Sequence, residues 1–433
     1  MTERIEQLLE DYATQPVPAD KTFSGVRIGL VLGGIGIALP ALLIGAQVGS
    51  ALGAADSLRA VLIAAVIVTS LATITGIIGA RTRLSTYMII EFSFGRVGSK
   101  LVNFMFALSQ IGWFAVNAFI FGEAAETIGR RSLGLDLAPY VYIVGGGILM
   151  TVSTIFGFKA LDKLALFAVP LLFATLILMI GETFQLLSLE ELLEIPGSGE
   201  MSLSTAVTAL AGGIMVGVVL IPDLTRYARS SWHAVVAVLL GLALIEPLVY
   251  MTGALPALAT GEAQVLDLML ALGLGAWALG ILVFTSWTTN AVNLYGAGLA
   301  MTATLPMARE WWLIAGAGTL GTLLALLNIS DWFIDFLIYQ SITFAPVVGI
   351  YVTNYYLVHG GSYSLERLDT LPGVGWQAFA AWVLGSAASF TTEQGLWTLT
   401  RLPSLDGAFT AAAVYVVLTL GLARLMAPGR TGH

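Results

Sequence analysis

The chain has 433 residues, of which 57% are hydrophobic and 11% charged, and its mean hydropathy is +0.88. A soluble domain carries about 25% charged residues, so this composition predicts an integral membrane protein, with the lipid bilayer as its surroundings. The formal net charge of −8 lies largely in solvated N-terminal and loop carboxylates, and we expect no nucleic-acid partner and no obligatory protein partner. The lack of cysteine excludes disulfides and thiolate chemistry.

Residues 1–23 are expected to form a cytoplasmic N-terminal segment. They are acidic and carry Ile5, Leu8, Leu9 and Tyr12 at helical spacing, unlike a basic, cleavable signal peptide. The pattern predicts a short amphipathic helix that ends near Pro16.

Twelve apolar stretches of about 20 residues follow, each long enough to cross a bilayer as a helix. They lie at 26–50, 57–80, 101–124, 138–158, 163–185, 203–222, 233–256, 272–301, 311–329, 333–357, 375–393 and 407–427. With the N-terminus inside, the inner segments hold fifteen Lys and Arg residues and the outer segments four. Because positive loops resist translocation, both termini are expected in the cytoplasm and the protein in the inner (plasma) membrane.

The first and sixth spans have unusual glycine placement. The first has glycines at 33, 34 and 36 followed by Pro40, and the sixth has Gly212 and Gly213 before Pro222. Glycine and proline weaken helices, and irregular backbone at membrane depth must face protein or water. Two interrupted helices five spans apart predict an inverted repeat with a binding site at the midplane. The alternative is close helix packing at small residues.

The third span carries Gln110 and Trp113, which one helical turn places on the same face. An unpartnered amide in hydrocarbon costs several kcal/mol, so Gln110 is expected to face protein, water or a ligand. The pair predicts a binding site. The alternatives are an amide that joins two helices and an ordinary packing aromatic.

The seventh span contains Glu246, the one carboxylate placed well inside a predicted helix. An intramembrane carboxylate is by default a candidate functional site, and a protonated Glu could carry protons. The alternative is a neutral, buried Glu that bonds a neighbouring helix.

The eighth span has the densest polar run, from Thr285 to Asn290, with Asn293 beyond it. Hydroxyl and carbonyl oxygens are hard ligands suited to a small cation, and threonines here could act beside unwound carbonyls of the first span. The alternative is that these hydroxyls bond back to their own helix.

Several motifs in order along residues 24–358 resemble those of the bacterial cytosine permeases. They are Ser93-Phe94-Gly95-Arg96-Val97-Gly98-Ser99, Gln110-Ile111-Gly112-Trp113-Phe114, Asp223-Leu224-Thr225-Arg226-Tyr227 and Trp287-Thr288-Thr289-Asn290. These permeases belong to the purine, cytosine and allantoin permease family, also called the nucleobase:cation symporters. The resemblance implies an all-α polytopic fold of twelve transmembrane helices, with a five-plus-five inverted repeat of the leucine-transporter type and two further helices.

The resemblance divides the chain into a first repeat at 24–186, an extracytoplasmic loop at 187–202, a second repeat at 203–358 and helices 11 and 12 within 359–433. It implies sodium-coupled uptake of a nucleobase by alternating access, with no organic cofactor. Carried over by position, Gln110 and Asn290 would bond the base and Trp113 would stack on it. Gly213 and Ile214 would border the substrate. Sodium would lie between the carbonyls of Gly34 and Ile37 and the residues Thr285, Thr288 and Thr289.

This chain departs from the family in the sixth span. Ile214 stands where the cytosine permeases place an aromatic residue, and Val216 stands in place of a serine. One stacking wall and one polar contact are lost, so a bulkier, less polar or only partly aromatic ring than cytosine is expected to fit. The roles implied for Trp113, Gln110 and Asn290 suit their side chains, since an indole can stack on a flat ring and amides can form hydrogen bonds with its edge.

The sequence therefore predicts a secondary transporter for a small heterocycle, coupled to sodium or, through Glu246, to protons. An intramembrane enzyme is disfavoured, because cysteine is absent and no histidine is deeply embedded, and no catalytic residue is expected. A channel is disfavoured because the polar residues cluster around four spans and do not form a continuous pore.

Overall fold

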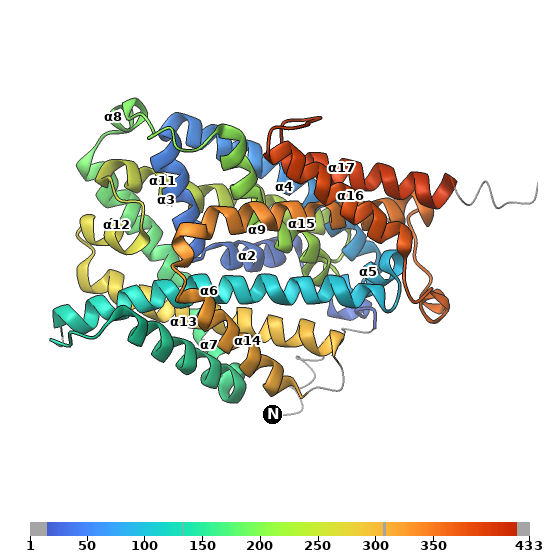
Figure 1. Cartoon of the computed structure of the whole chain (residues 1–433), viewed down its shortest axis with the longest axis horizontal. Helices are drawn as coiled ribbons and strands as arrows, with labels where there is room; N and C mark the ends of the chain where they lie inside the picture. The colour runs from blue at the N-terminus through green and yellow to red at the C-terminus, as the bar shows by residue number, and fades with distance from the viewer. Residues whose placement is uncertain (1–14, 133, 306–308, 422–433) are drawn as a thin grey trace, which may run out of the picture.

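The computed structural model describes residues 15–132, 134–305 and 309–421, and its regular elements are helices (Figure 1). The predicted N-terminal amphipathic helix lies outside these residues. The α-helices are α2 Gly25–Gly36, α3 Leu39–Leu52, α4 Ala54–Thr82, α5 Thr86–Phe94, α6 Gly98–Ser132, α7 Pro139–Leu186, α8 Leu189–Glu194, α9 Leu203–Thr225, α10 Ser231–Val238, α11 Glu246–Thr260, α12 Val265–Ala271, α13 Gly275–Thr304, α14 Glu310–Ala325, α15 Phe333–Thr353, α16 Trp376–Glu393 and α17 Pro403–Val416. Short 3-10 helices are η1 Ala19–Lys21, η3 Ile329–Trp332 and η5 Leu365–Thr370, and short π-helical segments are η2 Leu239–Ile245, η4 Asn354–Val358 and η6 Val417–Gly421.

Among the described residues, six helical segments are long and apolar enough to cross a membrane. The pair formed by α2 and α3 makes a seventh if it is counted as one bent span. The predicted fourth and fifth spans form one helical stretch, α7, with Pro170 inside it. Its 48 residues would extend about 72 Å if straight, which is room for two spans. The protein is thus an all-helical, multi-pass membrane protein.

The first predicted span is broken at the expected place. The helix α2 ends at Gly36 and α3 begins at Leu39, with a bend of 65° between them. Ile37, between them, has φ −74° and ψ 81°, outside the helical region. Glycine lowers helix propensity before the break, and Pro40 is tolerated in the first turn after it, where its missing N–H is not needed.

The broken span α2–α3 runs parallel to the seventh span, α10–η2–α11, along its whole length. A side chain at Gly25 would collide with the carbonyl of His233, and a side chain at Gly49 would come within 2.7 Å of Ala254. The residue numbers of the contacting positions increase together along both spans, so the two spans run in the same direction. The break after Gly36 lies beside the π-helical segment η2 and the start of α11.

The remaining long helices pack in pairs around this unit. The helix α4 packs on α9, α9 on α15, and α6 on α13. Figure 1 shows α16 and α17 together at one edge of the bundle, where both also contact α15. Buried aliphatic and aromatic side chains fill the interfaces between these helices.

Candidate functional site

The helices α6 and α13, the third and eighth predicted spans, form an antiparallel interface that holds most of the predicted polar residues. The side-chain amide of Asn290 on α13 donates to the carbonyl of Phe114 on α6 over 3.0 Å. Further along, the hydroxyl of Thr304 donates to the carbonyl of Lys100 over 3.1 Å. The structure therefore brings the polar run of α13 against the Gln110–Phe114 segment of α6.

Gln110 and Trp113 lie half-buried on α6, one turn apart, but contact different helices. A side-chain carbon at Gly296 would come within 2.9 Å of the Nε2 atom of Gln110, so this amide lies against α13. The indole of Trp113 meets the rings of Phe333 and Phe336 nearly at right angles, with centroids 6.1 and 5.3 Å away. Such edge-to-face contacts are favourable and fix the orientation of the indole.

Asn290 is fully buried, and its amide is bonded within the protein. Its Nδ2 atom donates to Phe114 and lies 3.2 Å from the sulfur of Met150, while its Oδ1 atom accepts a bond of 3.4 Å from Asn293. A substrate that bonds this amide must replace one of these partners or share the Oδ1 atom, which has a second lone pair.

The hydroxyls of α13 bond back to their own helix, yet their oxygen atoms keep lone pairs. Thr285 donates to the carbonyl of Ile281 over 2.6 Å, and Thr288 donates to the carbonyl of Thr285 over 3.1 Å. A hydroxyl that donates one bond can still accept two. The hydroxyl of Ser286 is buried and has no partner among the described residues. This run can therefore offer several neutral oxygen ligands.

The break between α2 and α3 supplies backbone oxygens outside a regular helix. The N–H of Ile37 still donates to the carbonyl of Gly33 over 3.0 Å, but Ile37 itself has left the helical conformation. Within the described part of the chain, no three His, Asp or Glu side chains cluster as metal ligands. Neutral hydroxyl and carbonyl oxygens suit a hard monovalent cation such as sodium.

The sixth predicted span is not interrupted, which corrects the sequence-based expectation. The helix α9 is continuous through Gly212 and Gly213. A side chain at Gly212 would collide with the carbonyl of Leu337 on α15, and a side-chain carbon at Gly213 would lie 2.8 Å from Ile44 on α3. These glycines therefore permit close packing of α9 between α15 and α3, the alternative noted for small residues.

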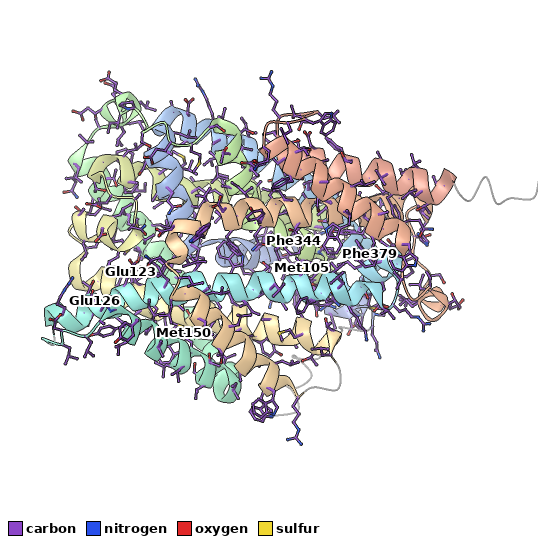
Figure 2. All side chains as sticks on the ribbon, viewed as in Figure 1. Met105, Glu123, Glu126, Met150, Phe344 and Phe379 are labelled. Atoms are coloured by element: carbon purple, nitrogen blue, oxygen red, sulfur yellow. The ribbon has the colours of Figure 1, made fainter. Side chains whose placement is uncertain are left out.

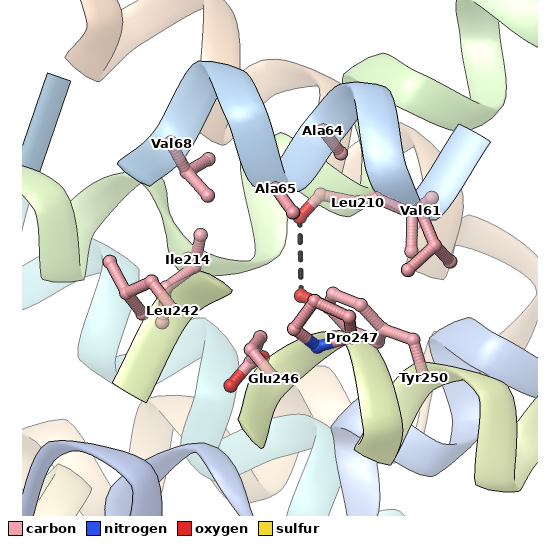
Figure 3. A pocket seen from close by; sticks show the side chains of 10 residues that line it. All are labelled: Val61, Ala64, Ala65, Val68, Leu210, Ile214, Leu242, Glu246, Pro247 and Tyr250. Atoms are coloured by element: carbon pink, nitrogen blue, oxygen red, sulfur yellow. Dashed lines mark hydrogen bonds between the residues drawn. The ribbon is translucent and has the colours of Figure 1, made fainter. Parts of the chain in front are cut away.

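Ile214 and Glu246 line the same small cavity, among α4, α9, η2 and α11 (Figure 3). The cavity leaves about 10 Å³ for the centre of a water molecule, which is about the room that one water needs. Tyr250, one turn after Glu246, donates its hydroxyl to the carbonyl of Leu210 on α9 over 3.2 Å. Because Ile214 lines this cavity, its side chain is directed toward α4 and α11.

A larger groove, of about 150 Å³, lies between α6 and α15. Met105 and Phe344, labelled on these two helices in Figure 2, are among its walls. Ser109 and Gln340 also line it and bond each other, with distances of 3.0 and 2.8 Å. None of the predicted site residues lines this groove, although Phe336 borders both the groove and Trp113.

Several neighbours of the predicted residues were not singled out by the sequence. Met150 and Ser153 on α7 bond Asn290 and Trp287, and Phe336 on α15 contacts Trp113. Tyr250, a further neighbour that lies beside Glu246, is the one with a sequence signal, since it follows Glu246 at the i+4 spacing of one helix face. The others come from helices distant along the chain.

Comparison with known proteins identifies relatives along nearly the whole chain. A family described as permeases for cytosine/purines, uracil, thiamine and allantoin matches residues 16–409. The cytosine permease of Escherichia coli (strain K12) is 28% identical over 413 residues, covering 94% of each chain. The hydantoin permease of Microbacterium maritypicum is 25% identical over 336 residues, covering 69% of this chain and 67% of the relative.

Solved structures share the fold. The inward-facing conformation of Mhp1 matches with a TM-score of 0.84 and 20% identity, covering 95% of this chain and 93% of that one. A Na⁺-coupled sialic acid symporter in a substrate-bound, outward-open state matches with a TM-score of 0.64 and 13% identity, covering 99% and 97%.

Proposed function

Because the chain belongs to the family of permeases for cytosine/purines, uracil, thiamine and allantoin, we propose that this membrane transporter imports a nucleobase or related heterocycle together with sodium. Family membership makes the protein a transporter and not an enzyme. Uptake would proceed by alternating access. The observation that carries the proposal is the break in α2–α3 combined with the polar α6–α13 interface.

The substrate would be held by residues of α6, α9 and α13. Gln110 and Asn290 would bond the polar edge of the ring, because an amide both donates and accepts. Trp113 would stack on its face, with Phe333 and Phe336 keeping the indole in position. Gly213 and Ile214 would border the site from α9 when the ligand is bound, whereas in this structure Gly213 packs on α3 and Ile214 lines the Glu246 cavity.

The substrate is proposed to be less polar or less fully aromatic than cytosine. Ile214 offers no stacking face, and Val216 offers no hydroxyl. One relative is called a cytosine permease and another a hydantoin permease, and hydantoins have a partly saturated ring. A ring of the second kind would lose less from a missing aromatic wall.

The sodium ion would be held by neutral oxygens, and the residues present fit it. The carbonyls of Gly34 and Ile37 would contribute from the break, and Thr285, Thr288 and Thr289 from α13. The lone pairs left on Thr285 and Thr288 support this role. Bound sodium would place a positive charge beside the substrate. The sodium gradient across the membrane would drive uptake.

The pattern of helix contacts supports the five-plus-five inverted repeat. The first span packs on the seventh, and the second packs on the sixth. Exchanging spans one to four with spans six to nine converts each of these pairs into the other. The pairs α6–α13 and α7–α14 map onto themselves under the same exchange. We place both termini in the cytoplasm and the protein in the inner membrane, from the distribution of Lys and Arg.

A thermal-shift screen of the purified protein tests this function. Nucleobases, hydantoins and related heterocycles would be added with and without sodium, since a bound ligand stabilises in proportion to its occupancy. We expect at least one ring to raise the melting temperature, and to raise it more in sodium than in potassium. A protein stabilised by no member of the panel, or equally in both salts, would contradict the proposal.

Proton coupling is the second candidate, because Glu246 is a buried carboxylate whose Oε2 atom has no partner among the described residues. Uptake into proteoliposomes that follows a pH gradient in sodium-free buffer, and is lost in Glu246→Gln, would replace sodium symport with proton symport.

A further inference from the structure

Glu246 stands where two helix irregularities meet. It is the first residue of α11, directly after the π-helical segment η2, and it faces the end of α2. A side-chain carbon at Gly36, the last residue before the break, would collide with the Oε2 atom of Glu246. The absence of a side chain at Gly36 is therefore what lets the carboxyl group lie against the break.

The carboxyl group is buried without a counter-charge. Glu246 is 4% exposed, and its Oε2 atom has no hydrogen-bond partner among the described residues. A buried carboxylate without a counter-charge is disfavoured relative to the neutral acid, because the Tyr250 hydroxyl beside it replaces only part of its hydration.

The charged groups on the elements that touch Glu246 or line its cavity are engaged elsewhere or lie at the far ends of their helices. On α2, Arg27 lies over the ring of Phe23 at 4.1 Å. On α4, Arg59 is exposed and pairs with Asp56 over 2.6 Å. The other charged groups of these elements are Arg81 at the opposite end of α4 and Asp223 in the last turn of α9, which accepts from Thr86. Tyr250 is the titratable side chain that faces Glu246.

The adjoining cavity has room for about one water molecule. Figure 3 shows Glu246 and Tyr250 beside it, with Leu210 and Ile214 of α9 and alanines of α4 opposite. The walls other than Glu246 and Tyr250 present aliphatic side chains. One water could bond a carboxyl oxygen, but a full hydration shell does not fit.

We propose that Glu246, with one water in this cavity, is a proton-binding site that holds α2 against α11, and that loss of its proton separates the two helices at the break. The proton passes from the carboxyl group to water, which leaves a carboxylate. That carboxylate needs more water than the cavity admits, so the helix contact must open to supply it. Gly34 and Ile37, whose carbonyls are proposed to bind sodium, flank Gly36 at the same break, so the measurements below are made in sodium-free buffer.

The position of the site explains how one proton would act on the transport cycle. Glu246 touches the break of the first span, and Tyr250, one turn away, bonds the sixth span through Leu210. The first of these spans is proposed to contribute to the sodium site, and the sixth is proposed to border the substrate. A change at Glu246 would therefore bias the relative position of helices that carry the proposed ion and substrate sites.

Infrared difference spectroscopy of the purified protein in lipid tests the proposal without any transport assay. We expect a band from a protonated carboxyl group at neutral pH that shifts in D₂O and disappears in Glu246→Gln. The matched control is Glu126→Gln, which alters a half-buried carboxylate on α6 that pairs with Arg130 over 3.2 Å, and it should leave this band in place. A wild-type spectrum without the band, or a band of unchanged intensity in Glu246→Gln, would overturn the proposal.

Thermal unfolding against pH provides a second measurement. The folded protein keeps a proton that the unfolded chain releases, so stability falls as pH rises, by up to tenfold in the folding equilibrium per pH unit. Glu246→Gln should lack this component of the slope, and the control Glu126→Gln should keep it. Equal slopes in wild type and Glu246→Gln would contradict the proposal. If Glu246→Gln does not fold, Glu246→Asp retains a carboxyl group and should show a band at a shifted frequency.

Discussion

Replacing Thr288 by valine is the most direct test of the proposed sodium ligands. Thr288 is 4% exposed, and its hydroxyl donates to the carbonyl of Thr285 over 3.1 Å. Valine keeps the branched shape of threonine and removes only the oxygen. The folding cost should be about 1 kcal/mol, the usual net value of one hydrogen bond, so the variant should remain folded.

The effect on sodium should be larger than the effect on folding. A hydrogen-bonding group that contacts a charge contributes about 1.5–3 kcal/mol, which corresponds to roughly a tenfold to hundredfold weaker affinity. Thr289→Val should act similarly, and the double variant should eliminate sodium dependence. Thr288→Ser is the control, because it retains the oxygen ligand and loses one methyl group.

Uptake of the stabilising heterocycle into proteoliposomes, measured against external sodium, gives the affinity directly. The concentration for half-maximal uptake should rise in Thr288→Val and stay near the wild-type value in Thr288→Ser. A folded Thr288→Val protein with an unchanged sodium dependence would refute the assignment of this hydroxyl to the ion.

The other predictions concern the substrate and the fold. Trp113→Ala should weaken binding of the stabilising heterocycle by about 1–3 kcal/mol, the value for loss of an aromatic side chain that stacks on a base. Gln110→Ala should also weaken binding. An unchanged affinity, measured by calorimetry in either folded variant, would remove that residue from the site. Ile214→Phe should shift preference toward cytosine-like rings by about 0.5–1.5 kcal/mol if residue 214 reaches the ligand. If it reaches only the Glu246 cavity, the ligand ranking will stay the same and stability will fall by about 1–3 kcal/mol from overpacking. Asp406→Ala should lower the stability of the contact between α16 and α17 by at least about 1.5–3 kcal/mol, the value for hydrogen bonds to a charged group. The buried carboxylate accepts bonds from Thr392, Thr398, Leu399 and Thr400, and a melting temperature equal to that of wild type would contradict this.

Composition and local pattern were sufficient for the membrane class, the helical fold and the break in the first span. The glycines before position 37 and Pro40 act within their own helix, so their effect can be calculated from local propensity. The structure confirms the bend at this place. The family resemblance was also readable from the sequence motifs, and the match over residues 16–409 confirms the family.

The second glycine pair shows where local reasoning fails. Gly212 and Gly213 have the same low helix propensity as the glycines of the first span, yet α9 runs through them without a break. The contacts with Leu337 and Ile44 show the role of this pair, since helices α15 and α3 occupy the space that side chains would need. Propensity alone cannot distinguish a glycine that breaks a helix from one that permits packing.

The surroundings of Glu246 were likewise decided by the tertiary structure. The sequence placed a carboxylate inside a span, but Gly36 is more than 200 residues away along the chain, and nothing local pairs the two. The parallel packing of α2–α3 on α10–α11 brings the break in one helix beside the π-helical segment of the other. The break after Gly36 was readable from the residues around it, whereas the groups that face a buried charge follow from which helices pack together, and only the folded chain determines that.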